Sequence, residues 1–214
     1  MKRSKTKALA IDFDGVIVDS QPMHYQAWQG VINELELEVN LEPEALLGVS
    51  VVSLVASFHL PEDIAARAAK RKNEIVIHQS KHSPPPLYPS VKSTLKFLSQ
   101  TYVLALVSSV EKPVAINTLK YHGLYDFFEA FILEGDYAKH KPHPDPYLVC
   151  LARLNFVPKQ VIAIEDSEVG VASAKAARLL TIAISNTSAR ESLREADYII
   201  ERFDQIVHLV EGKS

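Results

Sequence analysis

Four points of this chain carry side chains that could act together in one reaction, and each follows a short apolar run directly or through a loop. In order they are Asp12 and Asp14, then Ser108 and Ser109, then Lys141, then Glu165 and Asp166. Clustered carboxylates repel one another, and a divalent cation relieves that repulsion. All-oxygen ligands favour Mg²⁺ over zinc. The pattern predicts a magnesium site with two hydroxyls and a lysine beside it.

Each of these groups also has an ordinary structural explanation when taken alone. An Asp-x-Asp-Gly sequence is commonly a turn, and an EF-hand loop is excluded because the sixth position is Ile17 rather than glycine. The Ser108-Ser109 pair suits a helix N-cap, and Lys141 suits the surface. The stretch 165–167 could cap the next helix. A functional site is favoured because all four groups occur in order, each after an expected strand.

The apolar runs predict the elements that position these side chains. They are rich in Val, Ile and Leu without polar alternation, which is typical of strands covered on both faces. Helical patterns lie between them, so we expect an α/β fold with a doubly wound parallel sheet, a Rossmann-like core. In such sheets ligands bind at the carboxyl ends of the strands. The expected strands are 8–13, 102–107, 130–133, 161–164 and 181–184, with a sixth at 197–200.

One long segment interrupts the alternation of strand and helix. Between about residues 20 and 88 the apolar spacing is helical throughout. The segment ends in the proline-rich stretch 83–86, which suits a stiff linker. We therefore expect a catalytic core of residues 1–17 and 89–214, with a helical cap, 18–88, inserted after the first strand. The expected cap helices are 23–37, 43–47, 51–58 and 61–78.

Composition excludes several classes of protein. The chain has 214 residues, 47% of them apolar, and a formal net charge of −3. This balance gives no general attraction to nucleic acid or to an anionic membrane. The single cysteine, Cys150, excludes an internal disulfide, suits a reducing cytoplasm and is expected to be inert packing. The apolar stretch 45–60 is too short to span a bilayer. No secretory leader is expected, and the cap shows no exposed apolar stripe, so we expect a cytoplasmic monomer.

The four groups resemble the four motifs of the haloacid dehalogenase-like hydrolase superfamily. The motif-bearing residues are Asp12-Phe13-Asp14-Gly15-Val16, Ser108, Lys141-Pro142 and Glu165-Asp166-Ser167. The resemblance covers essentially the whole chain. The stretch 19–24 and the helical insert resemble the helical-cap subfamily, which includes β-phosphoglucomutase and many small-metabolite phosphatases.

The resemblance implies a role for each acidic residue. Asp12 would attack phosphorus and form an aspartyl-phosphate, which divides hydrolysis into two easier steps. Asp14 would protonate the leaving alcohol and then activate water. Mg²⁺ would be held by the Asp12 carboxylate, the backbone carbonyl of Asp14 and Asp166, with Glu165 just outside these ligands.

The resemblance also implies how the phosphoryl group is held. Ser108, the amide of Ser109 and Lys141 would contact its oxygens, and Lys141 would balance the charge of Asp12. His24, near the junction of cap and core, could reach Asp14 or the substrate; a plain helix position is the alternative. The run 70–72, Lys-Arg-Lys, is expected to be a solvated helix face. A lysine near this run contacts the second phosphate of the substrate in mutase-like relatives.

Three positions depart from the family pattern, two of them from the pattern of its mutases. Val51 stands where a mutase has an arginine for the distal phosphate, and Glu111 where it has a lysine. Both changes favour an Mg²⁺-dependent phosphatase of a small phosphorylated metabolite. A β-phosphoglucomutase-like phosphotransferase and a catalytically idle phosphate-binding module are the alternatives. Arg178 replaces the usual helix-ending glycine, and the sequence offers no functional reason for it.

Overall fold

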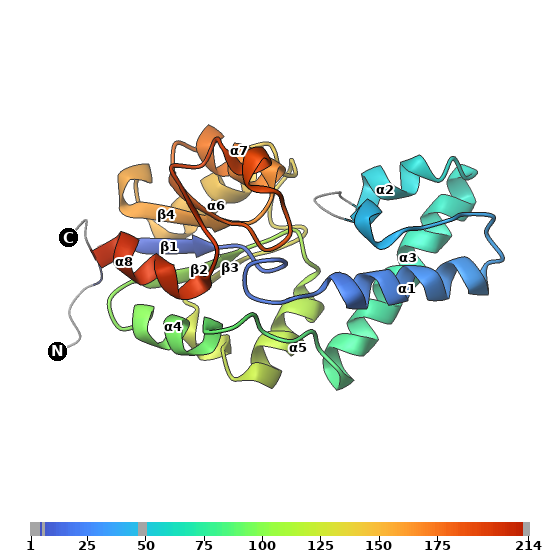
Figure 1. The fold of residues 1–214 in the computed structure, drawn as a ribbon, viewed down its shortest axis with the longest axis horizontal. Helices are drawn as coiled ribbons and strands as arrows, with labels where there is room; N and C mark the ends of the chain where they lie inside the picture. The colour runs from blue at the N-terminus through green and yellow to red at the C-terminus, as the bar shows by residue number, and fades with distance from the viewer. Residues whose placement is uncertain (1–4, 6, 47–50, 212–214) are drawn as a thin grey trace.

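A computed structural model describes residue 5 and residues 7–46 and 51–211, and its centre is one six-stranded parallel sheet (Figure 1). The strand order is β3-β2-β1-β4-β5-β6, with helices on both faces, which confirms the predicted fold class. All six expected strands are present within two residues of their predicted limits. They are β1 (Ala8–Ile11), β2 (Val103–Val107), β3 (Ala130–Ile132), β4 (Val161–Glu165), β5 (Leu180–Ile184) and β6 (Tyr198–Ile200).

The helices follow the expected order. The α-helices are α1 (Gln21–Glu34), α2 (Val51–Ser57), α3 (Glu62–His82), α4 (Val91–Leu98), α5 (Lys112–His122), α6 (Asp145–Leu154), α7 (Glu168–Ala176) and α8 (Ile206–Glu211). The 3-10 turns are η1 (Pro43–Leu46), η2 (Tyr125–Phe127), η3 (Pro158–Gln160), η4 (Arg190–Leu193) and η5 (Phe203–Gln205). Within the described ranges, no helix is both long and apolar enough to cross a membrane.

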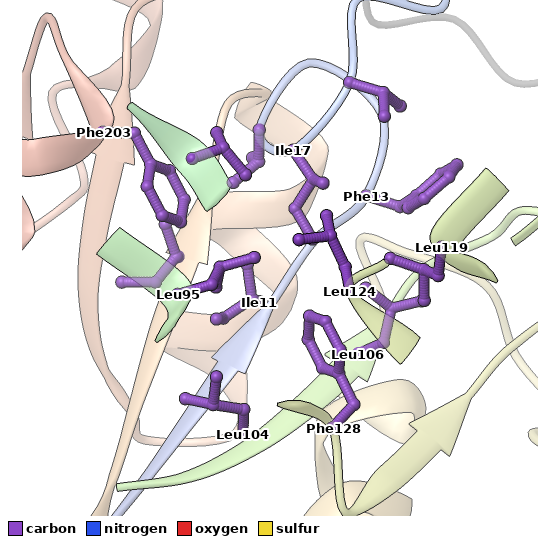
Figure 2. Packing of buried hydrophobic residues seen from close by; sticks show 14 of the residues in the cluster. Ile11, Phe13, Ile17, Leu95, Leu104, Leu106, Leu119, Leu124, Phe128 and Phe203 are labelled. Carbon is purple, nitrogen blue, oxygen red and sulfur yellow. The ribbon is translucent and has the colours of Figure 1, made fainter. Parts of the chain in front are cut away.

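The two faces of the sheet bury side chains of different size. Because side chains alternate along a strand, Leu9 and Ile11 of β1 join one cluster, while Ala8 and Ala10 join another. The first cluster includes residues of α4, α5 and α8, and Figure 2 shows Ile11 beside Leu95 of α4. The second includes α6 and α7, where alanines of the sheet leave room for the large ring of Tyr147.

The segment between β1 and β2 is helical, as the sequence predicts. Helices α1, α2 and α3 lie together at one end of the molecule (Figure 1). They share an apolar cluster of their own, in which Trp28 packs edge-on against Phe58 with ring centroids 5.5 Å apart. Three predictions need correction in detail. Pro43–Leu46 forms a 3-10 turn, α1 ends at Glu34, three residues before its expected end, and α3 runs to His82, four residues beyond its expected end.

Two adjacent chain segments join these helices to the sheet. Val18 forms an isolated bridge with Leu87, and the Asp19 amide donates to the Pro86 carbonyl at 3.0 Å. The amide of Tyr88 donates to the carbonyl of Ile17 at the same distance. These contacts lie where we expect the boundaries between the core, 1–17 and 89–214, and the cap, 18–88, and they support that proposed division.

The structure tests the two proposed helix caps, at Ser108-Ser109 and at residues 165–167. The N-cap of α5 is Glu111, without a side-chain cap, so the alternative explanation of Ser108 and Ser109 as a helix N-cap does not hold. The same explanation is right for Ser167, whose hydroxyl accepts a hydrogen bond from the Gly170 amide at 3.1 Å. Helix α8 has no counterpart among the sequence predictions.

Arg178 occupies a backbone conformation that favours glycine. Helix α7 ends in a Schellman motif, because the Leu179 amide donates to the Ala174 carbonyl and the Arg178 amide to that of Lys175. Arg178 has φ of 63° and is exposed, so its Cβ is strained without a burial gain.

We expect Arg178→Gly to raise the free energy of unfolding by about 1 kcal/mol, because glycine adopts positive φ without a Cβ clash. Urea denaturation measures this change. Arg178→Ala is the matched control: it retains a Cβ and should give no comparable gain. Equal stability of the two variants would rule out strain at this position.

Candidate active site

The acidic side chains gather where β1 and β4 end side by side. Asp12 follows β1, Glu165 is the last residue of β4, and Asp166 comes next. The connections leave these two strands in opposite directions across the sheet, an arrangement that forms a ligand-binding crevice in open α/β folds. One carboxylate oxygen from each of Asp12, Glu165 and Asp166 lies within 4.8 Å of the others, and all three residues are buried.

Lys141 reaches this cluster from the loop before α6. Its Nζ donates to Asp12 Oδ1 at 2.9 Å, to Glu165 Oε1 at 2.6 Å and to the carbonyl of Val107 at 3.2 Å. An ammonium has three N–H donors, so all of them are occupied. A phosphoryl oxygen would contact Lys141 directly only by replacing one of these partners, of which the Val107 carbonyl is the most distant.

Burial and charge perturb the pKa of each member of the cluster. Burial is the largest cause that raises the pKa of the Asp12 carboxyl, opposed by Lys141 and reinforced by Glu165. Burial and the charges of Asp12 and Glu165 raise the pKa of Asp166 well above its usual value. Burial would lower the pKa of Lys141, but the two carboxylates raise it. A divalent cation beside these carboxyl groups would favour their ionised forms, which burial and mutual repulsion disfavour.

The surroundings of the carboxylates fit a magnesium ion. A Cβ at Gly15 would lie 1.8 Å from Asp166 Oδ2, and one at Gly170 would lie 2.0 Å from Glu165 Oε2, so glycine makes room for each acid. The Thr187 hydroxyl donates to Asp166 Oδ2 and orients that carboxylate. The acidic ligand atoms are all oxygens, as Mg²⁺ prefers.

The carboxylate of Asp14 has different partners. Its Oδ1 accepts a hydrogen bond from the Ser20 hydroxyl at 2.5 Å and lies 3.9 Å from Nε2 of His24 in α1. Burial alone would raise the pKa of Asp14, but His24 and Ser20 hold it below its usual value. Asp14 therefore lies beside the three-carboxylate cluster with an ionised side chain at neutral pH.

The two serines predicted to hold a phosphoryl group follow β2. Ser108 is buried, and its amide donates to the carbonyl of Ile132 on the neighbouring strand. Ser109 is exposed. The hydroxyl of Tyr137 lies 3.3 Å from both the Ser108 carbonyl and the Ser109 hydroxyl, and it braces this turn. Because Val107 contacts Lys141, the turn adjoins the acidic cluster.

Sequence reasoning missed several residues of the site. Thr187 and Asn186 follow β5, and the Asn186 amide donates to the Gly15 carbonyl at 2.8 Å. The rule that polar residues after a strand are candidates would have found both. Tyr147 is fully buried and donates to Glu165 Oε1. No sequence signal separated it from the apolar residues of its helix.

The prediction of a solvated face at 70–72 is wrong for Lys72. This residue of α3 is 2% exposed, and burial lowers the pKa of its ammonium, partly offset by the charges of Glu111 and Asp14. Arg71 does face solvent, where it pairs with Glu34 at 2.9 Å. Helix α3 therefore contributes the buried ammonium of Lys72, which interacts electrostatically with Glu111 and Asp14.

Two other predictions concern residues near the site. Cys150 is buried, and burial raises the pKa of its thiol to about 12, which agrees with a packing role. Residues 47–50 and the side chain of Val51 lie outside the part of the chain that the structure describes. The departure at Val51 remains a sequence observation.

Comparison with known proteins finds close similarity. A family model described as haloacid dehalogenase-like hydrolase matches residues 9–184. A fructose-1-phosphate phosphatase of Escherichia coli is 30% identical over 79% of this chain and 91% of its own. A phosphorylated carbohydrates phosphatase of Thermotoga maritima is 30% identical over 80% and 81%. The crystal structure of a β-phosphoglucomutase from Clostridium difficile superposes with a TM-score of 0.81 at 24% identity, covering 97% of this chain and 96% of the other.

Proposed function

Because this chain belongs to the haloacid dehalogenase-like hydrolase family, we propose that it is an Mg²⁺-dependent phosphatase of a small phosphorylated metabolite. The observation that carries the proposal is the buried contact of Lys141 with Asp12, which lies beside Asp166 at the carboxyl ends of β1 and β4. Both phosphatase relatives at 30% identity are named for phosphorylated sugars, so a sugar phosphate is the substrate class we favour. A cytoplasmic monomer is part of the same proposal.

Asp12 is the proposed nucleophile. Its carboxylate oxygen forms a bond to phosphorus while the bond from phosphorus to the ester oxygen breaks, and Asp14 gives its proton to the leaving alkoxide. In the second step Asp14 takes a proton from water, the water oxygen bonds to phosphorus, and the bond to Asp12 breaks. Free Asp12, inorganic phosphate and protonated Asp14 are then restored for the next cycle.

In the absence of substrate, the charge of Asp14 suits one of its two proposed roles. Its ionised form, favoured by His24 and Ser20, is the form that accepts a proton from water. The acid role needs a proton on the same carboxyl. A dianionic phosphoryl group placed beside Asp14 would raise its pKa and supply the reason for protonation when substrate binds.

The metal ligands in this proposal are the carboxylates of Asp12 and Asp166 and the backbone carbonyl of Asp14. The bound Mg²⁺ would supply positive charge that stabilises the phosphoryl oxygens in the transition state. Ser108 and the amide of Ser109 would hold those oxygens, with Lys141 taking part by exchanging its contact with Val107.

Residues of the cap interface favour hydrolysis over the mutase alternative. A mutase must hold a bisphosphate, which requires a second cationic grip on the distal phosphate. Lys72 is the buried cation of α3, but the charge of Glu111 offsets it. Val51 supplies no charge where a mutase has arginine. This chain lacks the mutase arginine at position 51 and the mutase lysine at position 111. Contacts to charged groups are worth about 1.5–3 kcal/mol each, so the loss of these two weakens retention of a bisphosphate by about a hundredfold or more.

We expect net release of inorganic phosphate from monophosphate sugars, with no requirement for a bisphosphate activator. One reaction mixture with β-glucose 1-phosphate, Mg²⁺ and enzyme measures both phosphate release and glucose 6-phosphate formation. A wider set of phosphorylated sugars and polyols, with EDTA as the metal-free control, finds the preferred substrate. Efficient isomerisation with negligible phosphate release would favour the mutase. Absence of both reactions with every substrate would favour the idle phosphate-binding module.

A further inference from the structure

Tyr147 is linked to the proposed reacting groups by buried hydrogen bonds. It lies on α6, is fully buried, and donates its hydroxyl hydrogen to Glu165 Oε1. The same oxygen accepts a hydrogen bond from Lys141 Nζ at 2.6 Å, and Nζ also contacts Asp12. A continuous chain of buried polar contacts therefore runs from Tyr147 through Glu165 and Lys141 to the proposed nucleophile.

We propose that Tyr147 is a positioning residue for phosphoryl transfer, which acts by holding Glu165 so that Lys141 stays on Asp12. The inference rests on the proposed function. The hydroxyl of Tyr147 bonds to Glu165 and not to a proposed metal ligand or to a group that holds the substrate. Its effect on the reaction passes through two other side chains.

The other side of Glu165 shows why one hydroxyl has this influence. Glu165 Oε2 is buried and has no hydrogen-bond partner among the described residues. It lies against the backbone of Gly170, where a Cβ would stand 2.0 Å away. Helix α7 thus blocks the carboxylate on one side, and the two donors Tyr147 and Lys141 fix it on the other.

Loss of the hydroxyl changes the sharing of the ammonium. With Tyr147 present, Oε1 divides its charge between two donors, and Lys141 bonds to both Glu165 and Asp12. With one donor removed, Glu165 becomes a stronger acceptor for Lys141 and draws it away from Asp12. The chemical step then slows more than substrate binding weakens, because Ser108 and the amide of Ser109 still hold the phosphoryl group.

Tyr147→Phe tests this directly because it removes the hydroxyl and keeps the ring. We expect kcat for phosphate release to fall about tenfold, the loss of one hydrogen bond to a charged group, with KM changed less than about twofold. Tyr102→Phe is the matched control, since that buried hydroxyl donates to the Val210 carbonyl at 3.0 Å, outside the site. It should leave kcat unchanged. Equal kcat values for both variants and the wild type would overturn the proposal.

Two further variants separate positioning from general damage. Gly170→Ala pushes the same carboxylate from its other side, so it should also lower kcat with little change in KM. In a Glu165→Gln background, Tyr147→Phe should have no additional effect on kcat, because the residue through which it acts has already been altered. Independent, multiplicative losses in that double variant would show that Tyr147 does not act through Glu165.

A crystal structure of Tyr147→Phe keeps this inference separate from the proposed function. We expect Lys141 Nζ to lie farther from Asp12 Oδ1 than the 2.9 Å of the wild type. If the wild type released no phosphate from any substrate, the proposed function would fail, and the same structure would still decide whether Tyr147 positions Lys141. Unchanged positions of Glu165 and Lys141 would contradict the inference.

Discussion

Asp12→Asn should lower the rate of phosphate release by about 10⁴-fold or more, the scale of loss when a covalent nucleophile is removed. A neutral amide does not attack phosphorus, so neither of the two proposed steps proceeds. The fold should persist because asparagine has nearly the same shape and Lys141 keeps its contact with Glu165. Steady-state assays with the preferred sugar phosphate give the rate, and circular dichroism with thermal unfolding reports on the fold.

Asp197→Asn is the matched control for this substitution. Asp197 also carries an ion pair, a solvent-exposed one with Lys175 at 2.8 Å, and accepts a hydrogen bond from the Thr181 amide near the start of β5, away from the carboxyl ends of the strands. It should lose some stability and keep its rate. Undiminished activity of Asp12→Asn would refute covalent catalysis at Asp12.

Asp166→Ala should weaken Mg²⁺ binding and activity together, each by about a hundredfold or more, because a proposed direct ligand is lost and losing even a supporting contact costs 10- to 100-fold. In this variant the carboxylates of Asp12 and Glu165 would still repel one another. Calorimetric titration with Mg²⁺ measures affinity independently of turnover. A partial recovery of rate at excess Mg²⁺ is expected if affinity is the main loss.

Glu168→Ala is the control for the metal experiment. Glu168 is an exposed acid two residues farther along, in the first turn of α7, and its removal should leave Mg²⁺ affinity unchanged. Full activity of the wild type in EDTA would contradict the metal-dependent mechanism. Equal Mg²⁺ affinity of Asp166→Ala and the wild type would contradict the assignment of Asp166 as a ligand.

Strand ends explain why much of the site could be predicted. Buried parallel strands show as unbroken apolar runs, and each run fixes where its carboxyl end lies. Asp12 and Asp166 follow two such runs directly, and the structure brings their carboxylates within 4.8 Å of each other. The positions of these acids could therefore be predicted from the local apolar pattern and from the rule that ligands bind at the carboxyl ends of parallel strands.

The missed residues depend on contacts between distant parts of the chain. Tyr147 resembles any aromatic residue of an apolar helix face until its hydroxyl meets Glu165. Lys72 belongs to a charged run, and its burial arises only because α3 packs near Glu111 and Asp14. Helix α8 is six residues long, too short for a periodic pattern to be distinct. Periodicity is a local signal, whereas the contacts of Tyr147 and Lys72 are not local.

The most direct test of the proposed mechanism is a crystal structure of the wild type grown with Mg²⁺ and beryllium fluoride. Beryllium trifluoride imitates a phosphoryl group bonded to a carboxylate. We expect it on a carboxylate oxygen of Asp12, with Mg²⁺ held by Asp12 and Asp166 and the fluorides facing Ser108 and Lys141. A fluoride complex bonded elsewhere, or Mg²⁺ bound away from Asp12 and Asp166, would contradict phosphoryl transfer through Asp12.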